Sequence, residues 1–253
     1  MTMPPEEITV TCPKCGETYK DWYRPSMNLM LDDFDDDYIE EMSSVTCPSC
    51  ETKVRMGSLV VGEDGTFWVP GMTEVGALLG AARFAADRHR DQRRKDIKSS
   101  PYINHVLSVA EVLTRHGIED ITTLQAALLH DTIEDTETSP DELDHLFGSE
   151  VLSVVLEVTD DKSLHKDERK RLQIEKSLHL SDRAKLVKLG DMISNVTDVG
   201  ASPPADWSLE RRIEYLDWTE QVVHGCRGVH EWLEEQYDIA LDDAREALEV
   251  NDL

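Results

Sequence analysis

The spacing of apolar residues changes once along this chain of 253 residues, near Pro70-Gly71, and this change constrains the fold more than any other feature. From residue 72 onward apolar side chains recur at helical spacing, and no second strand-rich region follows. The first apolar face consists of Val75, Leu78, Leu79, Ala82, Ala85 and Ala86. Further helical stretches are expected at about 102–116, 140–158, 166–178, 182–198, 208–224 and 228–249. We therefore predict that residues 71–253 form an all-α domain.

Capping residues predict where two of these helices meet. Gly117 is expected to end the helix over 102–116, because glycine adopts the left-handed backbone that closes many helices. Thr122 or Thr123 is expected to cap the next helix, which runs toward residue 131.

Residues 1–70 have a different composition, with short β-rich pieces at 8–11 and 54–61 around two CPxC pairs. Two such pairs, each on a tight turn, are typical of a zinc ribbon, where four thiolates hold a tetrahedral ion. Four thiolates leave no open coordination position, so a structural Zn²⁺ is expected. The ligands would be Cys12, Cys15, Cys47 and Cys50, whereas Cys226 stands alone and is expected in the core.

The gap between the two cysteine pairs is 31 residues, longer than the usual spacing of about 15–20. Seven of the twelve residues at 31–42 are Asp or Glu, so we interpret this stretch as an exposed insertion that accounts for the excess. The ribbon-like domain is therefore expected over residues 1–70, with a protein partner as an alternative role.

The chain carries 52 acidic and 26 basic residues, a net charge of −26. Nucleic acids and anionic membranes are bound through cations, so the charge argues against both as partners. No apolar run approaches the 18 residues of a membrane span, and the first ten residues lack a basic segment followed by an apolar one. We expect a cytoplasmic protein.

Polar residues in apolar surroundings predict a metal site in the helical domain. His130 and Asp131 follow the apolar run 126–129, where burying an imidazole and a carboxylate is costly without partners. His105 lies on the apolar face of the preceding helix, and Asp191 follows apolar residues of a later one. Two imidazoles and two carboxylates suit Mn²⁺ or Fe²⁺ better than a structural Zn²⁺.

Two acids follow the His-Asp pair at a distance of about one helical turn. Glu134 is expected to position or deprotonate a water molecule, and Asp135 to share this proton transfer. A divalent ion would acidify that water and neutralise charge on a phosphoryl group, which predicts a metal-dependent phosphohydrolase.

Five of the 26 basic residues gather within nine positions of this acidic chain, at Arg90, Arg93, Arg94, Lys95 and Lys98. Arg94 and Lys95 lead into the segment that bears His105, and guanidinium and ammonium groups both bind phosphate. Asn195 follows Asp191 by four residues, so the two side chains share one helical face.

Several segments closely resemble one family, the stringent-response alarmone hydrolases with an HD domain, and especially their stand-alone, Mesh-type members. The matching segments are HRDQRRKD (89–96), SPYINH (100–105), AALLHDTIEDTETS (126–139), EVTDDKSL (157–164), ERKRLQ (168–173) and AKLVKLGDMISN (184–195). The resemblance spans roughly residues 74–235 and implies an all-α HD-domain helical bundle. It also implies a Mn²⁺ site at His105, His130, Asp131 and Asp191, with Glu134 and Asp135 as catalytic carboxylates.

The same resemblance assigns substrate contacts and points to two departures. The family's contacts fall on Arg94, Lys95, Asn195, Trp207, Tyr215, Lys166 and Arg211. Val106 stands where proline usually follows the metal-binding histidine, and Gly190 and Met192 flank Asp191 where alanine and lysine are usual. Neither departure removes a ligand.

The resemblance implies a Mn²⁺-dependent (p)ppGpp 3′-pyrophosphohydrolase that releases pyrophosphate and GDP or GTP. Two alternatives remain at this point. The same centre could act on another nucleotide, such as (p)ppApp or NADPH, or the protein could bind an alarmone without catalysis. The complete HDxxED set favours an enzyme, because binding alone requires no water-activating carboxylate.

Overall fold

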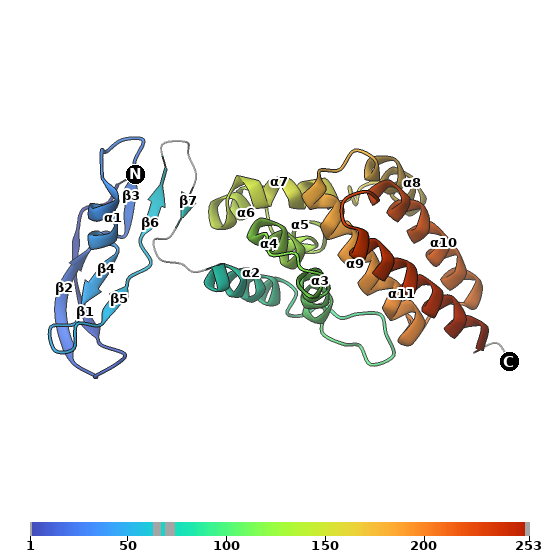
Figure 1. Ribbon diagram of the computed structural model, residues 1–253, viewed down its shortest axis with the longest axis horizontal. Coiled ribbons are helices and arrows are strands. Elements are labelled where there is room, and N and C mark those ends of the chain that lie inside the picture. Colours follow the sequence, from blue (N-terminus) through green and yellow to red (C-terminus); the bar gives the residue numbers. More distant parts are fainter. Residues whose placement is uncertain (1, 63–66, 69–73, 251–253) are drawn as a thin grey trace. The chain divides into compact units, whose positions relative to one another are not determined.

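The computed structural model describes residues 2–62, 67–68 and 74–250. The chain divides into two compact units, Met1–Gly76 and Ala77–Leu253. A β-rich first unit precedes an all-α second unit, which confirms the predicted fold class (Figure 1). The change in pattern at Pro70-Gly71 lies outside the described residues.

The first unit contains three small sheets. Strands β1 (Glu6–Thr11) and β2 (Thr18–Tyr23) form one antiparallel pair, and β4 (Ser44–Thr46) and β5 (Lys53–Arg55) form another. Strand β6 (Leu59–Val61) lies between β3 (Ser26–Asn28), its parallel neighbour, and β7 (Phe67–Trp68), its antiparallel neighbour. The piece predicted at 8–11 belongs to β1, whereas the piece at 54–61 is divided between β5 and β6.

The acidic stretch between the cysteine pairs, predicted to be an exposed insertion, contains a regular helix. Most of it forms helix α1 (Asp36–Met42), whose first turn is capped by the Asp35 carboxylate accepting from the Tyr38 amide. Ile39 is buried together with Met27 and Val60 in a small core. The acidic residues therefore lie around one apolar anchor that fixes the helix to the unit.

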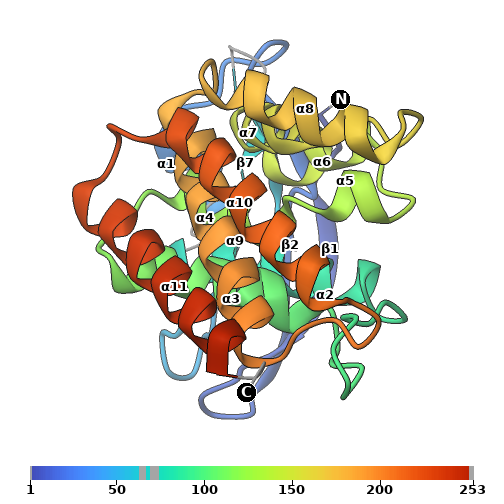
Figure 2. The ribbon, with the colours of Figure 1, turned by 90° about the vertical axis from the view of Figure 1, so that its right-hand side faces the viewer.

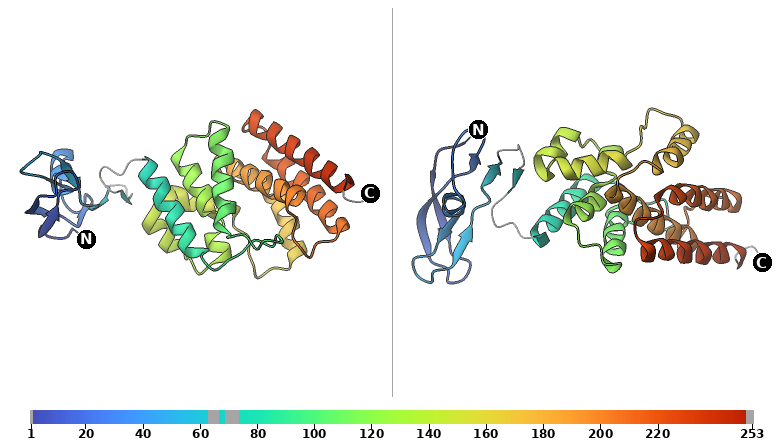
Figure 3. Two further views of the ribbon diagram at one scale, coloured as in Figure 1. Left: turned by 90° about the horizontal axis from the view of Figure 1, so that it is seen from below. Right: turned by 45° about the horizontal axis from the view of Figure 1, so that its top comes forward.

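Ten helices of very different length make up the described part of the second unit: α2 (Glu74–Arg88), α3 (Ile103–Arg115), α4 (Ile121–Leu129), α5 (Thr132–Asp135), α6 (Pro140–Phe147), α7 (Ser149–Val158), α8 (Lys166–Ser177), α9 (Asp182–Ala201), α10 (Leu209–Cys226) and α11 (Glu231–Val250). Helix α9 is buried along most of its length and packs against α3, α4, α7, α10 and α11. Figure 2 shows α9 in the middle of the bundle, and both views of Figure 3 show α11 beside it.

Two predicted helix boundaries are wrong for identifiable reasons. Asp120, not Thr122 or Thr123, caps α4, because its carboxylate accepts from both the amide and the hydroxyl of Thr123. The single stretch predicted at 140–158 is two helices, since Gly148 has a φ of +84° and separates α6 from α7. Gly117, with a φ of +83°, follows α3 as predicted.

Two glycines of α9 bring neighbouring helices unusually close. A Cβ at Gly200 would lie 2.9 Å from the Cα of Ala244 on α11. A Cβ at Gly190 would lie 3.1 Å from Val109 Cγ1 and 3.2 Å from Leu113 Cγ, both on α3. The positions of α3 and α11 against α9 therefore depend on the absence of these side chains.

Among the described helices, none combines the length and the apolar character needed to cross a membrane.

Replacing Gly200 by Ala should lower the stability of the helical unit. The new methyl group would meet the α11 backbone, and overpacking of this kind costs about 1–3 kcal/mol. Gly80 is the matched control, because its helix has open space at the Cβ position and Gly80→Ala should gain about 0.5–1 kcal/mol. Urea unfolding followed by far-ultraviolet circular dichroism measures both; equal gains in the two variants would refute the close approach.

Candidate active site

Four side chains from separate helical segments converge in the interior of the second unit. His105 lies in the first turn of α3, His130 directly follows α4, and Asp131 begins the short segment of α5. Asp191 lies in the middle of α9. His105, His130 and Asp191 are each less than 10% exposed.

The nitrogen and oxygen atoms of this cluster are at distances suited to one shared ion. Donor atoms of His105, His130 and Asp191 all lie within 4.8 Å of one another. His105 Nε2 is 3.2 Å from Asp191 Oδ1, and His130 Nε2 is 3.0 Å from Asp131 Oδ2. Asp131 Oδ2 is also 3.7 Å from His105 Nε2, so the fourth residue joins the same group.

Neighbouring groups fix the orientation of the ligands. His130 Nδ1 donates to the Ala127 carbonyl at 2.8 Å, which turns Nε2 toward the cluster, where an ion could take the place of its proton. His105 Nδ1 lies 3.2 Å from Ser194 Oγ, which holds this ring with its Nε2 toward the cluster. The buried Nε2 of His130, although 3.0 Å from Asp131 Oδ2, makes no hydrogen bond of acceptable geometry among the described residues. A metal ion would satisfy this orphaned atom, so the residues fit a divalent cation.

The charges of the cluster favour a bound cation as well. Burial alone disfavours charged His130, but the carboxylates of Asp131 and Asp191 outweigh it and raise the pKa of His130 to about 9. Burial also opposes ionisation of Asp131, yet His130 and His105 hold the pKa of Asp131 well below its usual range. Imidazole nitrogens and carboxylates at this spacing are ligands that a first-row divalent ion accepts.

Glu134 lies beside the cluster with a carboxyl group suited to proton transfer. Its burial, together with the charges of Asp131, Asp160 and Asp135, raises the pKa of Glu134 to about 7 despite a hydrogen bond from the Asp160 amide. That amide donates to Glu134 Oε2 at 3.0 Å, and Arg169 Nη1 is 3.5 Å from Oε1. The carboxyl group is thereby oriented, and its pKa lies where a general base is most effective.

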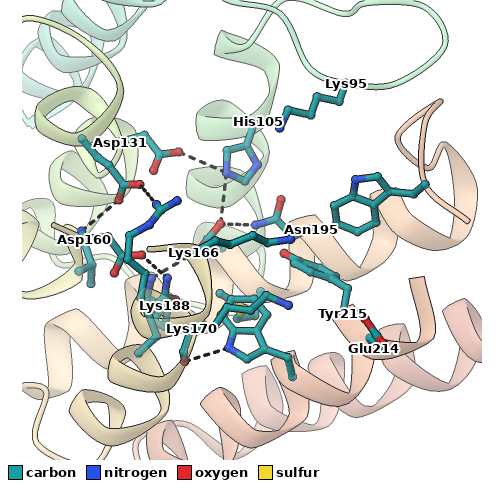
Figure 4. Close-up of a pocket in the computed structure, with 18 of the residues that line it drawn as sticks. Lys95, His105, Asp131, Asp160, Lys166, Lys170, Lys188, Asn195, Glu214 and Tyr215 are labelled. Atoms are coloured by element: carbon teal, nitrogen blue, oxygen red, sulfur yellow. Dashed lines mark hydrogen bonds and ion pairs between the residues drawn. The ribbon is translucent and has the colours of Figure 1, made fainter. Parts of the chain in front are cut away.

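A cavity of about 360 Å³ opens from the cluster, and basic side chains line it. Lys95, Asp160, Lys166 and Lys170 are among the residues that Figure 4 shows around it. The six basic residues of the lining are Lys95, Lys166, Arg169, Lys170, Lys188 and Arg211. The same lining holds five acidic residues, Asp131, Glu134, Asp160, Asp191 and Glu214. The charge balance of the cavity is therefore far more positive than that of the chain as a whole, which fits an anionic ligand.

A second cavity of about 300 Å³ shares part of this lining. Glu134 lines the first cavity and Asp135 the second, so the two consecutive acids face different spaces. Both cavities are lined by Lys95, Tyr102, Asn195, Trp207 and Tyr215. Arg94 lines only the second of them, and Lys166 and Arg211 only the first, so every substrate contact predicted from the sequence borders one of the two.

Arg94 is already engaged by other residues of the site. Its Nη2 atom donates to Asp198 at 2.5 Å and to Asn195 at 3.0 Å. Asn195 in turn donates to Asp191 Oδ1 at 2.6 Å. The guanidinium group is thus connected to a metal-ligand candidate through one amide, a role that the basic cluster in the sequence did not reveal.

Aromatic rings form one wall of the first cavity. Trp207 and Tyr215 are in edge contact at 5.1 Å between centroids, and Trp218 lies 5.3 Å from Tyr215. Arg211 covers the Trp207 ring, and Lys170 Nζ is 4.8 Å from the centre of Trp218. These rings therefore pack against the core and also hold two of the cations in the cavity.

Several residues of the site were not singled out from the sequence. Tyr102 donates to Asp131 Oδ2 at 2.6 Å, and Gln92 donates to Asp135 Oδ2 at 2.7 Å. Lys162 also donates to Asp135. These residues and Arg169, Lys170 and Asp160 all lie in the segments that carried the family resemblance, so the motifs held the signal although single-residue patterns did not.

The four cysteines of the first unit form a separate cluster. Their sulfur atoms lie within 4.8 Å of one another, and both Cys12–Cys50 and Cys15–Cys47 are 3.6 Å apart. A disulfide would need about 2.05 Å, whereas tetrahedral thiolates at about 2.3 Å from an ion are roughly 3.8 Å apart. The distances fit a metal-thiolate site.

The two cysteine turns have the same backbone geometry. The Gly16 amide donates to the Cys12 carbonyl, and the Glu51 amide donates to the Cys47 carbonyl, both at 3.0 Å. Gly16 and Glu51 both have positive φ, +78° and +57°. Each turn therefore presents its pair of thiolates in the same way, as the repeated CPxC spacing predicted.

Comparison with known proteins identifies the helical unit. The HD domain family matches residues 81–215. Human guanosine-3′,5′-bis(diphosphate) 3′-pyrophosphohydrolase MESH1 is 54% identical over 164 residues, which cover 64% of this chain and 92% of the human protein. MESH1 of Drosophila melanogaster is 48% identical over 162 residues, 64% of this chain and 90% of the fly protein.

A solved structure has the same fold and also a related sequence. It is described as a metazoan ortholog of SpoT that hydrolyzes ppGpp, with a TM-score of 0.64 and 45% sequence identity. The match covers 66% of this chain and 94% of that one. The resemblance in the motifs is thus confirmed over most of the relatives' length, and the chain belongs to the HD-domain family and, within it, to the Mesh-type small alarmone hydrolases.

Proposed function

We propose that this protein is a metal-dependent hydrolase that removes the 3′-diphosphate of (p)ppGpp as pyrophosphate and leaves GDP or GTP. The observation that carries the proposal is the opening of the His/Asp cluster onto a cavity with six basic side chains. The names of the human and fly relatives state the same activity for those proteins.

His105, His130, Asp131 and Asp191 would hold the ion, and we propose Mn²⁺ because two imidazoles and two carboxylates suit it. When bound, the ion would activate water and neutralise charge on the phosphoryl group. Glu134 takes a proton from the attacking water, and the Asp160 amide and Arg169 keep its carboxylate in place.

The remaining residues of the site bind the nucleotide. Lys95, Lys166 and Arg211 neutralise phosphate oxygens, and Asn195 accepts or donates a hydrogen bond beside Asp191. Trp207 and Tyr215 border the nucleoside. Arg94, held by Asp198, adds positive charge to the second cavity, where Asp135 takes part in proton transfer.

For the first unit we propose a structural Zn²⁺ at Cys12, Cys15, Cys47 and Cys50, in a ribbon-like domain over residues 1–70. A reducing compartment is required to keep four thiolates available, so we propose a cytoplasmic location. The net charge of −26 argues against nucleic acids and membranes as partners, and a protein partner for the ribbon is compatible with it.

The products of one nucleotide panel test the substrate. With Mn²⁺, ppGpp should give GDP and pyrophosphate in equal amounts and no stepwise phosphate, because attack at the phosphorus next to the ribose breaks its bond to the 3′ oxygen. Ion-exchange chromatography with separate phosphate and pyrophosphate assays measures this. Efficient removal of the NADPH 2′-phosphate with ppGpp left intact, or preference for ppApp, would overturn the assignment.

The metal site has its own control within the same experiment. Asp191→Asn should lose turnover because a charged ligand becomes neutral, whereas Asp182→Asn, at the exposed start of the same helix, should keep it. Normal Mn²⁺-dependent activity in Asp191→Asn would remove this residue from the site.

Glu134→Gln should lose turnover yet gain stability. Loss of a general base should lower kcat by about 100-fold or more with little change in KM. Because burial raises its pKa from 4.5 to about 7, Glu134 binds a proton in the folded state that the unfolded chain releases. The stability of metal-free wild type therefore falls as the pH rises between these values, and glutamine avoids this loss.

Thermal unfolding of metal-free protein should accordingly show a higher Tm for Glu134→Gln than for wild type at pH 8, with the difference closing toward pH 5. Glu137→Gln, an exposed neighbour, is the control and should match wild type in both turnover and Tm. A variant that is inactive but no more stable at pH 8 would show that the carboxyl group is not strained by burial.

Cys47→Ser should release zinc and unfold the first unit while hydrolysis continues. Cys47 is fully buried in the thiolate cluster, and metal binding and folding are coupled in such small domains. Cys226→Ser is the matched control, because this cysteine is equally buried but lies in the helical core, so it should retain zinc and lower the Tm. Metal analysis and limited proteolysis distinguish the two patterns. Loss of hydrolysis in Cys47→Ser would show that the second unit needs a folded first unit for activity.

A further inference from the structure

His89 is a buried imidazole to which the mechanism above gives no task. It follows directly on α2, is only 1% exposed, and among the described residues it lines neither of the two cavities of the site. Its Nε2 atom has no hydrogen-bond partner among those residues, while its Nδ1 atom is 2.6 Å from Gln92 Oε1. A buried polar ring with one short bond calls for an explanation.

The bond to Gln92 fixes the proton of the imidazole. The side chain of Gln92 donates through Nε2 to Asp135 Oδ2 at 2.7 Å, so its other atom, facing His89, is the carbonyl oxygen. An oxygen only accepts, and Nδ1 of His89 must therefore carry the hydrogen. The result is a chain of two donated bonds, from His89 to Gln92 and from Gln92 to Asp135.

Gln92 is held in this chain by its backbone as well. Its amide donates to the His89 carbonyl at 3.0 Å, and its carbonyl accepts from the Tyr102 amide at 3.2 Å. Lys162 donates to the other carboxylate oxygen of Asp135. Both oxygens of Asp135 therefore accept a hydrogen bond, one from Gln92 in the loop after α2 and one from Lys162 in the loop after α7.

A second contact of His89 leads to the metal-binding residues. Its ring lies against the ring of Tyr102, with 4.9 Å between centroids and 34° between planes. The Tyr102 hydroxyl donates to Asp131 Oδ2 at 2.6 Å. Asp131 and Asp135 are therefore both reached from His89 through one intervening side chain.

We propose that His89 is a positioning residue of the hydrolase: through Gln92 it holds Asp135 in its working orientation, and through Tyr102 it supports Asp131. This inference rests on the proposed function, in which Asp135 takes part in proton transfer. The connection through Gln92 should matter more for activity than the ring contact with Tyr102. A donated hydrogen bond fixes the direction of its acceptor, whereas ring packing fixes mainly position.

Two substitutions in the full-length, Mn²⁺-loaded protein distinguish the hydrogen bond to Gln92 from the ring contact with Tyr102. His89→Phe keeps a ring against Tyr102 but removes the donor, so kcat for ppGpp should fall by about 10- to 100-fold with KM nearly unchanged. His89→Asn keeps a donor near the position of Nδ1 and should recover most of that loss. His116→Phe is the matched control, since His116 Nδ1 also bonds to a neighbour, but that neighbour is the Val112 carbonyl, and Val112, unlike Gln92, lines neither cavity of the site.

A double-mutant cycle tests whether the effect runs through Asp135. In an Asp135→Asn background, His89→Phe and Gln92→Leu should each cost little further activity, because the carboxylate they position is already gone. Gln92 is only half-buried, so its variant tests the chain if His89→Phe fails to fold. Costs that multiply with that of Asp135→Asn would mean a merely structural role and overturn the proposal.

A spectroscopic measurement keeps this inference separate from the proposed function. In metal-free protein with ¹⁵N-labelled histidine, the imidazole signal that disappears in His89→Phe should be that of a ring with its hydrogen on Nδ1, and it should shift in both Gln92→Leu and Asp135→Asn. An Nε2–H form for His89 would overturn the hydrogen-bond chain. If wild type leaves ppGpp intact while these signals behave as expected, the substrate assignment fails and the chain to Asp135 stands.

Discussion

The burial of two imidazoles and two carboxylates at one point is the constraint on which the helical unit depends. Ionised groups in a protein interior are tolerated only with partners close by, and here the partners come from each surrounding element. The Ala127 carbonyl orients His130, Ser194 lies against His105, and Tyr102 binds Asp131. The apolar packing of α3, α4 and α9 thus surrounds a polar cluster, and a cation would satisfy the nitrogen and oxygen atoms that face one another in it.

A contrast of charge surrounds this centre. The chain as a whole carries −26, while the cavity next to the cluster gathers six basic side chains from α8, α9, α10 and the segment before α3. Five acidic residues also line this cavity of about 360 Å³, so its charge is nearly balanced where that of the chain is strongly negative. The cavity is therefore the part of the second unit best suited to a small anion.

That His105, His130, Asp131 and Asp191 lie together could be predicted from the sequence, because each is a polar residue in an apolar helical pattern or in a recognisable motif. The roles of His89 and Gln92 could not, since both depend on a contact with Asp135, 43 residues beyond Gln92. Local spacing also failed to show that Glu134 and Asp135 face different cavities, because that divergence arises from the short helix α5 and not from the motif.

Errors at helix boundaries have the same origin. Thr123 is a good capping residue by type, but Asp120 takes that place because its carboxylate also accepts from Arg183, which lies on α9. Strand pairing in the first unit was equally hidden, as β3 and β6 are separated by α1 and two further strands. In each case tertiary contacts decided between local alternatives of similar energy.

The close approach at Gly190 links residues outside the His/Asp cluster to two members of it. His105 and Val109 lie one turn apart on α3, and Gly190 precedes Asp191 on α9. The close spacing of α3 and α9 at Gly190 therefore also sets the distance between His105 and Asp191. An alanine at this position fits only if Val109 or Leu113 yields by a few tenths of an ångström. Positions 109, 113 and 190 should therefore vary together among relatives, with a larger residue on α9 compensated by a smaller one on α3.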